Sequence, residues 1–165
     1  MTAFTHIDEA GNACMVDVSD KAVTAREATA AGTLSMSPAC FDAVVAHTVK
    51  KGDVLGVAQV GGIMGAKRTS ELIPLCHIVP LTHCQVVFSL QPESHTIEAR
   101  CTTRCSGQTG VEMEALTGVS TALLTLYDMC KALDKRMVIK DIHLVEKSGG
   151  RSGHFTFTEG GADHA

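Results

Sequence analysis

The chain has 165 residues, and its 14 Lys and Arg against 18 Asp and Glu give a formal net charge of −4. This length suits one domain, and 45% hydrophobic against 19% charged residues excludes an intrinsically disordered chain. Aromatic residues make up only 4%, and the acidic balance disfavours a surface that follows nucleic-acid phosphates, so we expect no nucleic-acid partner.

Periodicity and capping residues predict three elements in the first half of the chain. They are a strand over 22–33, a helix that begins at Ser37 or Pro38 and continues to about Val49, and a helix over 54–72 that Asp53 caps and Pro74 stops. In the second half of the chain the same signals predict a hairpin of strands 84–90 and 96–103 with its turn at 91–94. They also predict a helix over 111–134 and a strand over 138–146.

This order of elements matches an α+β, ferredoxin-like sandwich, in which an antiparallel sheet carries the helices on one face, with one extra helix. We predict a mobile N-terminal segment (1–14), a single catalytic domain (15–148) and a flexible tail rich in Gly and Ser (149–165). The second face of the sheet needs a cover, and in so small a domain the simplest cover is another subunit.

Seven cysteines without a regular spacing, and a start that lacks the basic and apolar runs of a signal peptide, predict free thiols and a cytoplasmic protein. No run of about 18 uncharged apolar residues is present, so we expect no membrane span.

The predicted helix over 54–72 is rich in glycine. Each glycine inside a helix costs about 1 kcal/mol against alanine, so a neighbour must gain from the missing side chains. Ala58, Gly62 and Ala66 repeat every four residues and form a groove for a second backbone. That backbone belongs either to the helix over 111–134 or to another subunit.

Ten of the cations lie in four short segments, whose convergence would make a phosphate site. For each segment, the alternative is that its cations simply lie on a solvent-exposed face. These cations are Lys50, Lys51, Lys67, Arg68, Lys131, Lys135, Arg136, Lys140, Lys147 and Arg151.

On the helix over 111–134, an apolar stripe that includes Leu116 and Leu123 faces the core, while Glu114, Asp128 and Lys131 fall on the opposite side. Asp128 and Lys131 are three residues apart and therefore neighbours. They are an ordinary surface ion pair unless a cleft desolvates them and shifts their pKa values towards neutrality, which would make them an acid/base pair.

Cys76, His77, His83 and Cys84 form a Cys-His-x5-His-Cys pattern, a weak indication of zinc because two pairs of adjacent residues would have to bind one ion. The tail from Lys147 to Gly153 joins consecutive glycines to two cations and could bind an anion.

Several segments together resemble the molybdenum cofactor biosynthesis protein C (MoaC) family. The resemblance covers about residues 4–155 and rests on MVDVSDK at 15–21, KKGDVL at 50–55, AKRTSELIPLCH at 66–77, GVEMEALT at 110–117, YDMCKA at 127–132 and KSGGRSG at 147–153. The family usually has a proline after the histidine of its Pro-Leu-Cys-His motif, where this chain has Ile78.

The resemblance implies a ferredoxin-like lyase that converts 3′,8-cyclo-7,8-dihydroguanosine triphosphate, a GTP-derived substrate, to cyclic pyranopterin monophosphate with release of diphosphate. It implies a homohexamer, a trimer of dimers with active sites at dimer interfaces. It also implies no resident metal or cofactor, and leaves open whether Mg²⁺ accompanies the substrate phosphates. The implied catalytic residues are Asp128 and Lys131, and the implied substrate-binding residues are Leu75, Cys76, His77, Glu112, Met113, Glu114, Lys51, Lys67, Lys147 and Arg26.

Two other functions are consistent with the residues alone. One is a metal-dependent GTP hydrolase that uses the Cys-His pattern, and the other is an oligomeric module that binds a phosphorylated ligand without converting it.

Overall fold

A computed structural model describes residues 6–8, 10–151 and 153–158, so the predicted mobile ends lie partly outside it. The described strands form one antiparallel sheet in the order β2-β3-β1-β4-β5. The strands are β1 (Thr24–Ser35), β2 (Leu81–Gln91), β3 (Thr96–Gly107), β4 (Val138–Ser148) and β5 (Phe155–Thr156). The helices are α1 (Pro38–Val45), α2 (Val54–Lys67), α3 (Thr69–Leu72) and α4 (Glu112–Cys130), and a 3₁₀ turn (Pro92–Ser94) joins β2 to β3.

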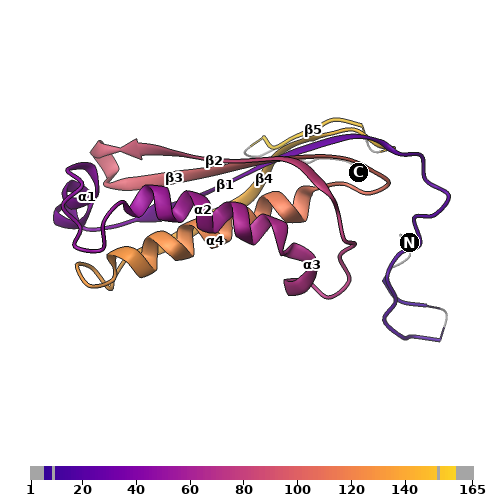
Figure 1. Ribbon diagram of the computed structural model, residues 1–165, viewed down its shortest axis with the longest axis horizontal. Helices are drawn as coiled ribbons and strands as arrows, with labels where there is room; N and C mark the ends of the chain where they lie inside the picture. Colours follow the sequence, from indigo (N-terminus) through magenta and orange to yellow (C-terminus); the bar gives the residue numbers. More distant parts are fainter. Residues whose placement is uncertain (1–5, 9, 152, 159–165) are drawn as a thin grey trace.

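The ferredoxin-like arrangement is confirmed, because β1 lies between β3 and β4 and pairs with both, while β2 lies outside β3. Helices α2 and α4 cover one face of the sheet, and α1 lies at one end of it (Figure 1). The core fills the space between that face and α4, and its largest fully buried side chains are Leu34, Ile97, Leu123 and Leu126.

The predicted capping residues begin the first two helices. The Ser37 side chain accepts a hydrogen bond from the Cys40 amide with Pro38 in the first turn, and the Asp53 carboxylate accepts from the Gly56 amide at 2.9 Å. Helix α1 ends at Val45, four residues before the predicted end, because the chain enters the left-handed region at His47, where φ is 55°.

The predicted helix over 54–72 is broken at Arg68. There φ is −110°, and the Arg68 amide bonds the Gly65 carbonyl three residues back. The hydroxyl of the buried Thr69 donates to the Ala66 carbonyl at 3.0 Å, which holds the tightened turn. The chain then starts α3 in a new direction.

The glycines of α2 pack against α4 of the same chain, which settles the choice left open by the sequence. A Cβ added at Gly62 would lie 2.9 Å from the Gly118 carbonyl oxygen, and one at Gly61 would lie 2.6 Å from the Thr125 hydroxyl. The side of α4 opposite the core stripe is therefore partly covered by α2. A helical wheel predicts the direction of each side chain on α4, but it cannot show that α2 packs against the side that faces away from the core stripe.

Helix α4 ends at Cys130 and not at the predicted Asp134, because Asp134 has other partners. Its buried carboxylate accepts hydrogen bonds from the backbone amides of Ser37 and Arg136, both at 2.8 Å. These bonds tie the turn after α4 to the start of α1.

Side chains of strand β4 alternate between the two faces of the sheet. Ile142 lies beside α4 near Gly32, whereas His143 contacts the Phe157 ring on the other face at 4.6 Å between centroids. The strand continues two residues past its predicted end, and β5, which was not predicted, pairs with it inside the tail. No helix of the described chain has the length and apolar character needed to cross a bilayer.

Candidate active site

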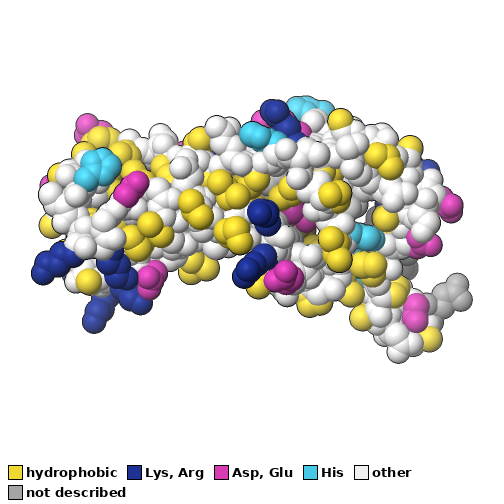
Figure 2. Space-filling view, viewed as in Figure 1, with side chains coloured by type: hydrophobic (Ala, Val, Ile, Leu, Met, Phe, Trp, Pro, Cys, Tyr) yellow, Lys and Arg dark blue, Asp and Glu magenta, His cyan; other side chains and the backbone are white. Residues whose placement is uncertain are grey.

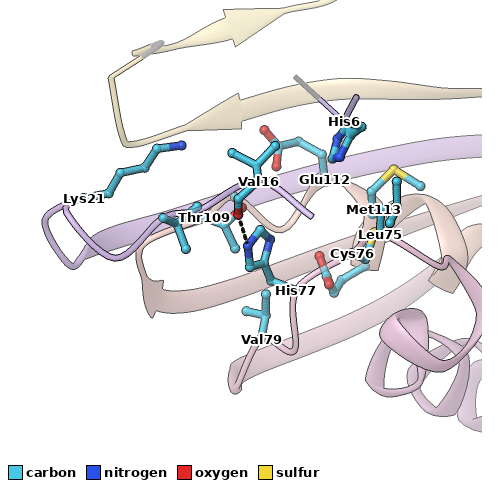
Figure 3. A pocket seen from close by; sticks show the side chains of 13 residues that line it. His6, Val16, Lys21, Leu75, Cys76, His77, Val79, Thr109, Glu112 and Met113 are labelled. Carbon is cyan, nitrogen blue, oxygen red and sulfur yellow. Dashed lines mark hydrogen bonds between the residues drawn. The ribbon is translucent and has the colours of Figure 1, made fainter. Parts of the chain in front are cut away.

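A cavity of about 330 Å³ opens where α4 begins. The loop after α3 contributes Leu75, Cys76 and His77, and the first turn of α4 contributes Glu112, Met113 and Glu114 (Figure 3). We call this cavity the ring pocket. The structure thus brings together six of the residues implied by the resemblance, while Ile78 of the same loop is exposed.

The fold places these two segments side by side for local reasons. Pro74 cannot continue α3, so the chain leaves the helix and runs extended towards β2. Helix α4 starts next to this loop without a side-chain cap, so its free backbone N–H groups and positive dipole end lie by the pocket.

Glu114 is the most unusual side chain of the ring pocket. Its residue is 4% exposed, and Oε2 is buried without a hydrogen-bond partner among the described residues. Burial raises the pKa of this carboxyl to about 7, and the nearby charge of Glu112 adds to the rise. A helical wheel places Glu114 on the polar side of the helix, but this expectation is wrong, because the pocket loop and the sheet enclose the first turn of α4.

Glu112 has a different environment, although it is only two residues away. Its Oε1 accepts a hydrogen bond from the Lys147 ammonium at 2.8 Å, and both side chains are half-buried. This ion pair brings the end of β4 to the mouth of the ring pocket, so Lys147 joins the predicted pocket residues.

A second hollow, of about 550 Å³, adjoins the ring pocket and shares Lys21, Thr109, Gly110 and Glu112 with it. Its other cations are Arg26 and Arg151, and Asp20 is the further acidic residue of its lining. We call it the cationic hollow. Its charge suits an anionic group that extends out of the ring pocket.

Arg26 supports the walls of the cationic hollow. Its Nε and Nη2 donate to the carbonyls of Gly107 and Gln108, each at 3.3 Å. Gly150 packs directly on the guanidinium with φ of 76°, so a Cβ there would overlap the Arg26 side chain. The glycines of the tail therefore allow the chain to close against Arg26.

The predicted catalytic pair lies at the other end of α4. Asp128 accepts from the Lys131 ammonium at 2.6 Å and from the Lys51 ammonium at 3.1 Å. Asp128 lies sixteen positions after Glu112 on the helix, so about 24 Å of helix axis lies between the pair and the ring pocket. Lys and Arg side chains gather at this end of the molecule in Figure 2.

The electrostatics of this end are those of a surface ion pair. The Asp128 side chain is 56% exposed, and hydrogen bonds from Lys131 and Lys51 lower the pKa of its carboxyl. The same contact raises the pKa of Lys131. Both shifts move away from neutrality, so one chain alone does not provide the cleft that acid/base exchange requires.

Lys67 lines neither the ring pocket nor the cationic hollow. It lies at the end of α2 beside a third hollow, of about 420 Å³, with His83 and Cys84. The four residues of the Cys-His pattern are thus divided between two sites, and no group of three or more His, Cys, Asp or Glu in the described chain is arranged to hold a metal.

Sequence reasoning missed several residues that form the site. Val16, Val18 and Lys21 line the ring pocket from a segment without regular structure, and Thr109 and Gly110 line it from the loop before α4. The available signal was that 15–21 and 110–117 are two of the segments that carry the resemblance.

Comparisons with known proteins converge on one family. The model of the MoaC family matches residues 15–150. The chain is 60% identical over 149 residues to a cyclic pyranopterin monophosphate synthase of Chloroflexus aurantiacus, a match that covers 90% of this chain and 91% of that protein. It is 57% identical over 155 residues to the protein of the same name from Limosilactobacillus fermentum, covering 94% of this chain and 93% of that protein. The corresponding protein of Clostridium acetobutylicum is 55% identical over 152 residues, covering 92% and 94%.

Proposed function

The chain belongs to the MoaC family, and from this premise we propose that it is a lyase of molybdenum cofactor biosynthesis. It converts 3′,8-cyclo-7,8-dihydroguanosine triphosphate to cyclic pyranopterin monophosphate and releases diphosphate. The main observation in support is the ring pocket, where one Glu114 oxygen has no hydrogen-bond partner in the described part of the chain, directly adjoining a hollow lined by three cations.

The ring pocket suits the guanine-derived ring system. Leu75 and Met113 supply apolar contact area, and the free Oε2 of Glu114 can accept from the N–H edge of the ring. Glu112 is less suited to this task because Lys147 already occupies one of its oxygens. Glu114 is therefore the residue to which we assign recognition of the ring.

The cationic hollow suits the triphosphate. Arg26 and Arg151 hold positive charge at its walls, and Lys147 lies beside it through its ion pair with Glu112. These cations offset the charge that builds on the departing diphosphate. No resident cofactor enters the proposal, and any Mg²⁺ arrives with the substrate phosphates. The reaction takes place in the cytoplasm, for which the support is that all seven cysteines are free thiols.

A complete site needs a second copy of the chain. Asp128, Lys131 and Lys51 lie too far from the ring pocket of their own chain to act there, but a two-fold dimer can place them over the pocket of its partner. Exposed apolar side chains between the two ends of α4 offer a surface for this contact: Val57, Val60 and Met64 on α2 and Leu124 on α4. We propose a homohexamer built as a trimer of such dimers.

The partner would also change the chemistry of Asp128 and Lys131. Removing water from the pair brings the pKa values of a carboxylate and an ammonium closer together. The reaction opens one ring, closes a pyran and forms a cyclic phosphate, so protons move at several atoms. We assign these transfers to Asp128 and Lys131, and Lys51 holds the Asp128 carboxylate in place. Lys67 remains a proposed triphosphate ligand only if the partner brings it to the site.

Mixed oligomers test this proposal. Asp128→Ala and Glu114→Ala chains with different tags are each expected to lose turnover of the cyclised triphosphate. When the two are co-expressed, about one site in four is expected to be intact, because random pairing gives hetero-dimers half the time with one complete site of two.

The two parts of the proposal fail separately. Wild-type protein that binds the triphosphate without forming cyclic pyranopterin monophosphate, measured by mass spectrometry, would overturn the function in favour of a binding module. Turnover by the wild type without recovery in the mixed oligomers would overturn only the shared site.

A further inference from the structure

One wall of the ring pocket is a segment with neither helix nor strand. Residues 16–21, which we call the pocket strap, pass the mouth of the pocket and place Val16, Val18 and Lys21 in its lining (Figure 3). The strap ends in a turn, in which the Lys21 amide donates to the Val18 carbonyl at 2.9 Å. A segment without ladder hydrogen bonds to the sheet keeps its position on the domain only if other groups bind its backbone.

Two side chains from the body of the domain fasten the pocket strap. A ring nitrogen of His77 contacts the Val16 carbonyl oxygen at 2.8 Å, the bond drawn in Figure 3. The Gln108 amide nitrogen donates to the carbonyls of Ser19 at 3.1 Å and Lys21 at 3.0 Å, so both of its N–H groups are used. His77 thus fastens one end of the strap, and Gln108 the other.

Gln108 is itself held firmly. It lies in the loop after β3, and its backbone carbonyl accepts from the Arg26 guanidinium. A neutral amide suits this position because it offers two donors to two carbonyls without adding a charge beside the cationic hollow. A carboxylate of the same shape would set acceptors against both carbonyls.

Lys21 is the charged side chain that the strap places at the pocket. It lines both the ring pocket and the cationic hollow, and Figure 3 shows it extending from the strap towards Glu112. Within the described part of the chain its ammonium makes no hydrogen bond or ion pair, unlike Lys147, which is bound to Glu112. A cation without a partner where the two cavities meet is available to an anionic ligand.

We propose that Gln108 is a positioning residue that fastens the pocket strap and so places the Lys21 ammonium on a phosphate of the bound substrate. The proposal rests on the function above, since it takes the triphosphate as the ligand. Lys21 makes the contact, and Gln108 acts through Lys21.

Kinetics and proteolysis of the whole protein test this role. In Gln108→Glu the KM for the cyclised triphosphate is expected to rise about tenfold with kcat unchanged, because two hydrogen bonds that hold the strap are lost. Trypsin cleavage after Lys21 is expected to accelerate, while cleavage after Lys135 at the far end stays constant.

A double-mutant cycle separates positioning from a general structural effect. Lys21→Met is expected to raise KM, and adding Gln108→Glu to it is expected to raise KM no further. The matched control is Gln59→Glu, which makes the same change at a glutamine that donates to the Val86 carbonyl between α2 and β2, away from the pocket. It is expected to leave KM at the wild-type value.

Each result decides one question. Additive effects of Gln108→Glu and Lys21→Met on KM, or a Gln108→Glu variant with wild-type KM and wild-type trypsin cleavage, would overturn the positioning role. Wild-type protein without turnover would instead overturn the proposed function, and the rate of cleavage after Lys21 would still show whether Gln108 fastens the strap.

Discussion

The two ends of α4 hold acidic side chains in opposite environments. At the start of the helix, Glu114 is almost fully buried, and one of its oxygens has no hydrogen-bond partner among the described residues. Burial raises its pKa to about 7. At the end of the helix, Asp128 is exposed and bound by two ammonium groups, and hydrogen bonds from Lys131 and then Lys51 lower its pKa. The same helix thus carries a desolvated acid and a fully solvated ion pair.

This difference shows what each end lacks. The start of α4 has a pocket with one carboxyl of near-neutral pKa, Glu114, but not the acid and base pair, whereas the end has a carboxylate and an ammonium without a pocket. A low pKa on Asp128 and a high pKa on Lys131 hinder proton exchange near neutral pH. The two ends become complementary if a second chain joins them, as proposed above.

The largest expected effect is on turnover at the exposed end. Asp128→Asn is expected to lower kcat by about 10²–10⁴-fold, the usual contribution of a general acid or base. Thermal stability is expected to stay close to the wild type because the side chain is exposed. Steady-state formation of cyclic pyranopterin monophosphate measures kcat, and a thermal melt at fixed protein concentration measures stability.

The matched control is Asp42→Asn, which changes an exposed aspartate on α1 that takes no part in the site. It is expected to keep full turnover. If Asp128→Asn is as active as this control, Asp128 is only a surface ion-pair partner.

A smaller effect is expected on stability at the buried end. Folding raises the pKa of Glu114 from 4.5 to about 7, so the folded chain binds this proton more tightly than the unfolded chain. The stability that the group contributes is fully present below pH 4.5 and is lost as pH rises through 7. Glu114→Gln stays neutral and is therefore expected to be more stable than the wild type at pH 8, by on the order of 3 kcal/mol.

Urea denaturation at pH 4.5 and pH 8 measures this difference, which should appear only at the higher pH. Glu112→Gln is the control, since it removes a carboxylate that Lys147 stabilises and is expected to give no gain at pH 8. Substrate binding should show the opposite dependence, because the carboxylate is the form that accepts N–H groups. KM of the wild type is therefore expected to fall as pH rises through 7, and equal KM values for Glu114→Gln and the wild type at pH 8 would remove Glu114 from ring recognition.

Much of the fold could be predicted because local signals determine it. Ser37 and Asp53 cap the helices that they were expected to cap, and the turn at 91–94 joins the predicted hairpin. The errors occur where tertiary contacts prevail over local pattern. The turn held by Thr69 ends α2, although the apolar periodicity of the sequence continues beyond it. Helix α4 ends before Asp134 because the carboxylate of that residue binds the backbone at the start of α1.

The site could be predicted only in part. Short motifs identified Cys76, His77 and Met113, and each motif stays together in space because it is a continuous segment. Periodicity could not show that Glu114 is buried, because burial depends on the loop that covers the helix. It also could not find Gln108, whose role depends on a strap separated from it by more than 80 residues in sequence.

The smallest expected effect is on the titration of Asp128, and it measures how far water screens the exposed end. The Lys131 ammonium lies closer than that of Lys51, at 2.6 Å against 3.1 Å, and its hydrogen bond is the larger cause of the lowered pKa. Lys131→Met is therefore expected to raise the pKa of Asp128 more than Lys51→Met does, with neither change altering the denaturation midpoint beyond measurement error. A carboxyl-carbon NMR titration follows the pKa directly. Equal pKa shifts in the two variants would show that the two ammonium groups lower the pKa of Asp128 by the same amount. An Asp128 pKa above its usual value in the wild-type oligomer would show that a partner chain already covers the pair, so that the contrast between the two ends of α4 disappears on assembly.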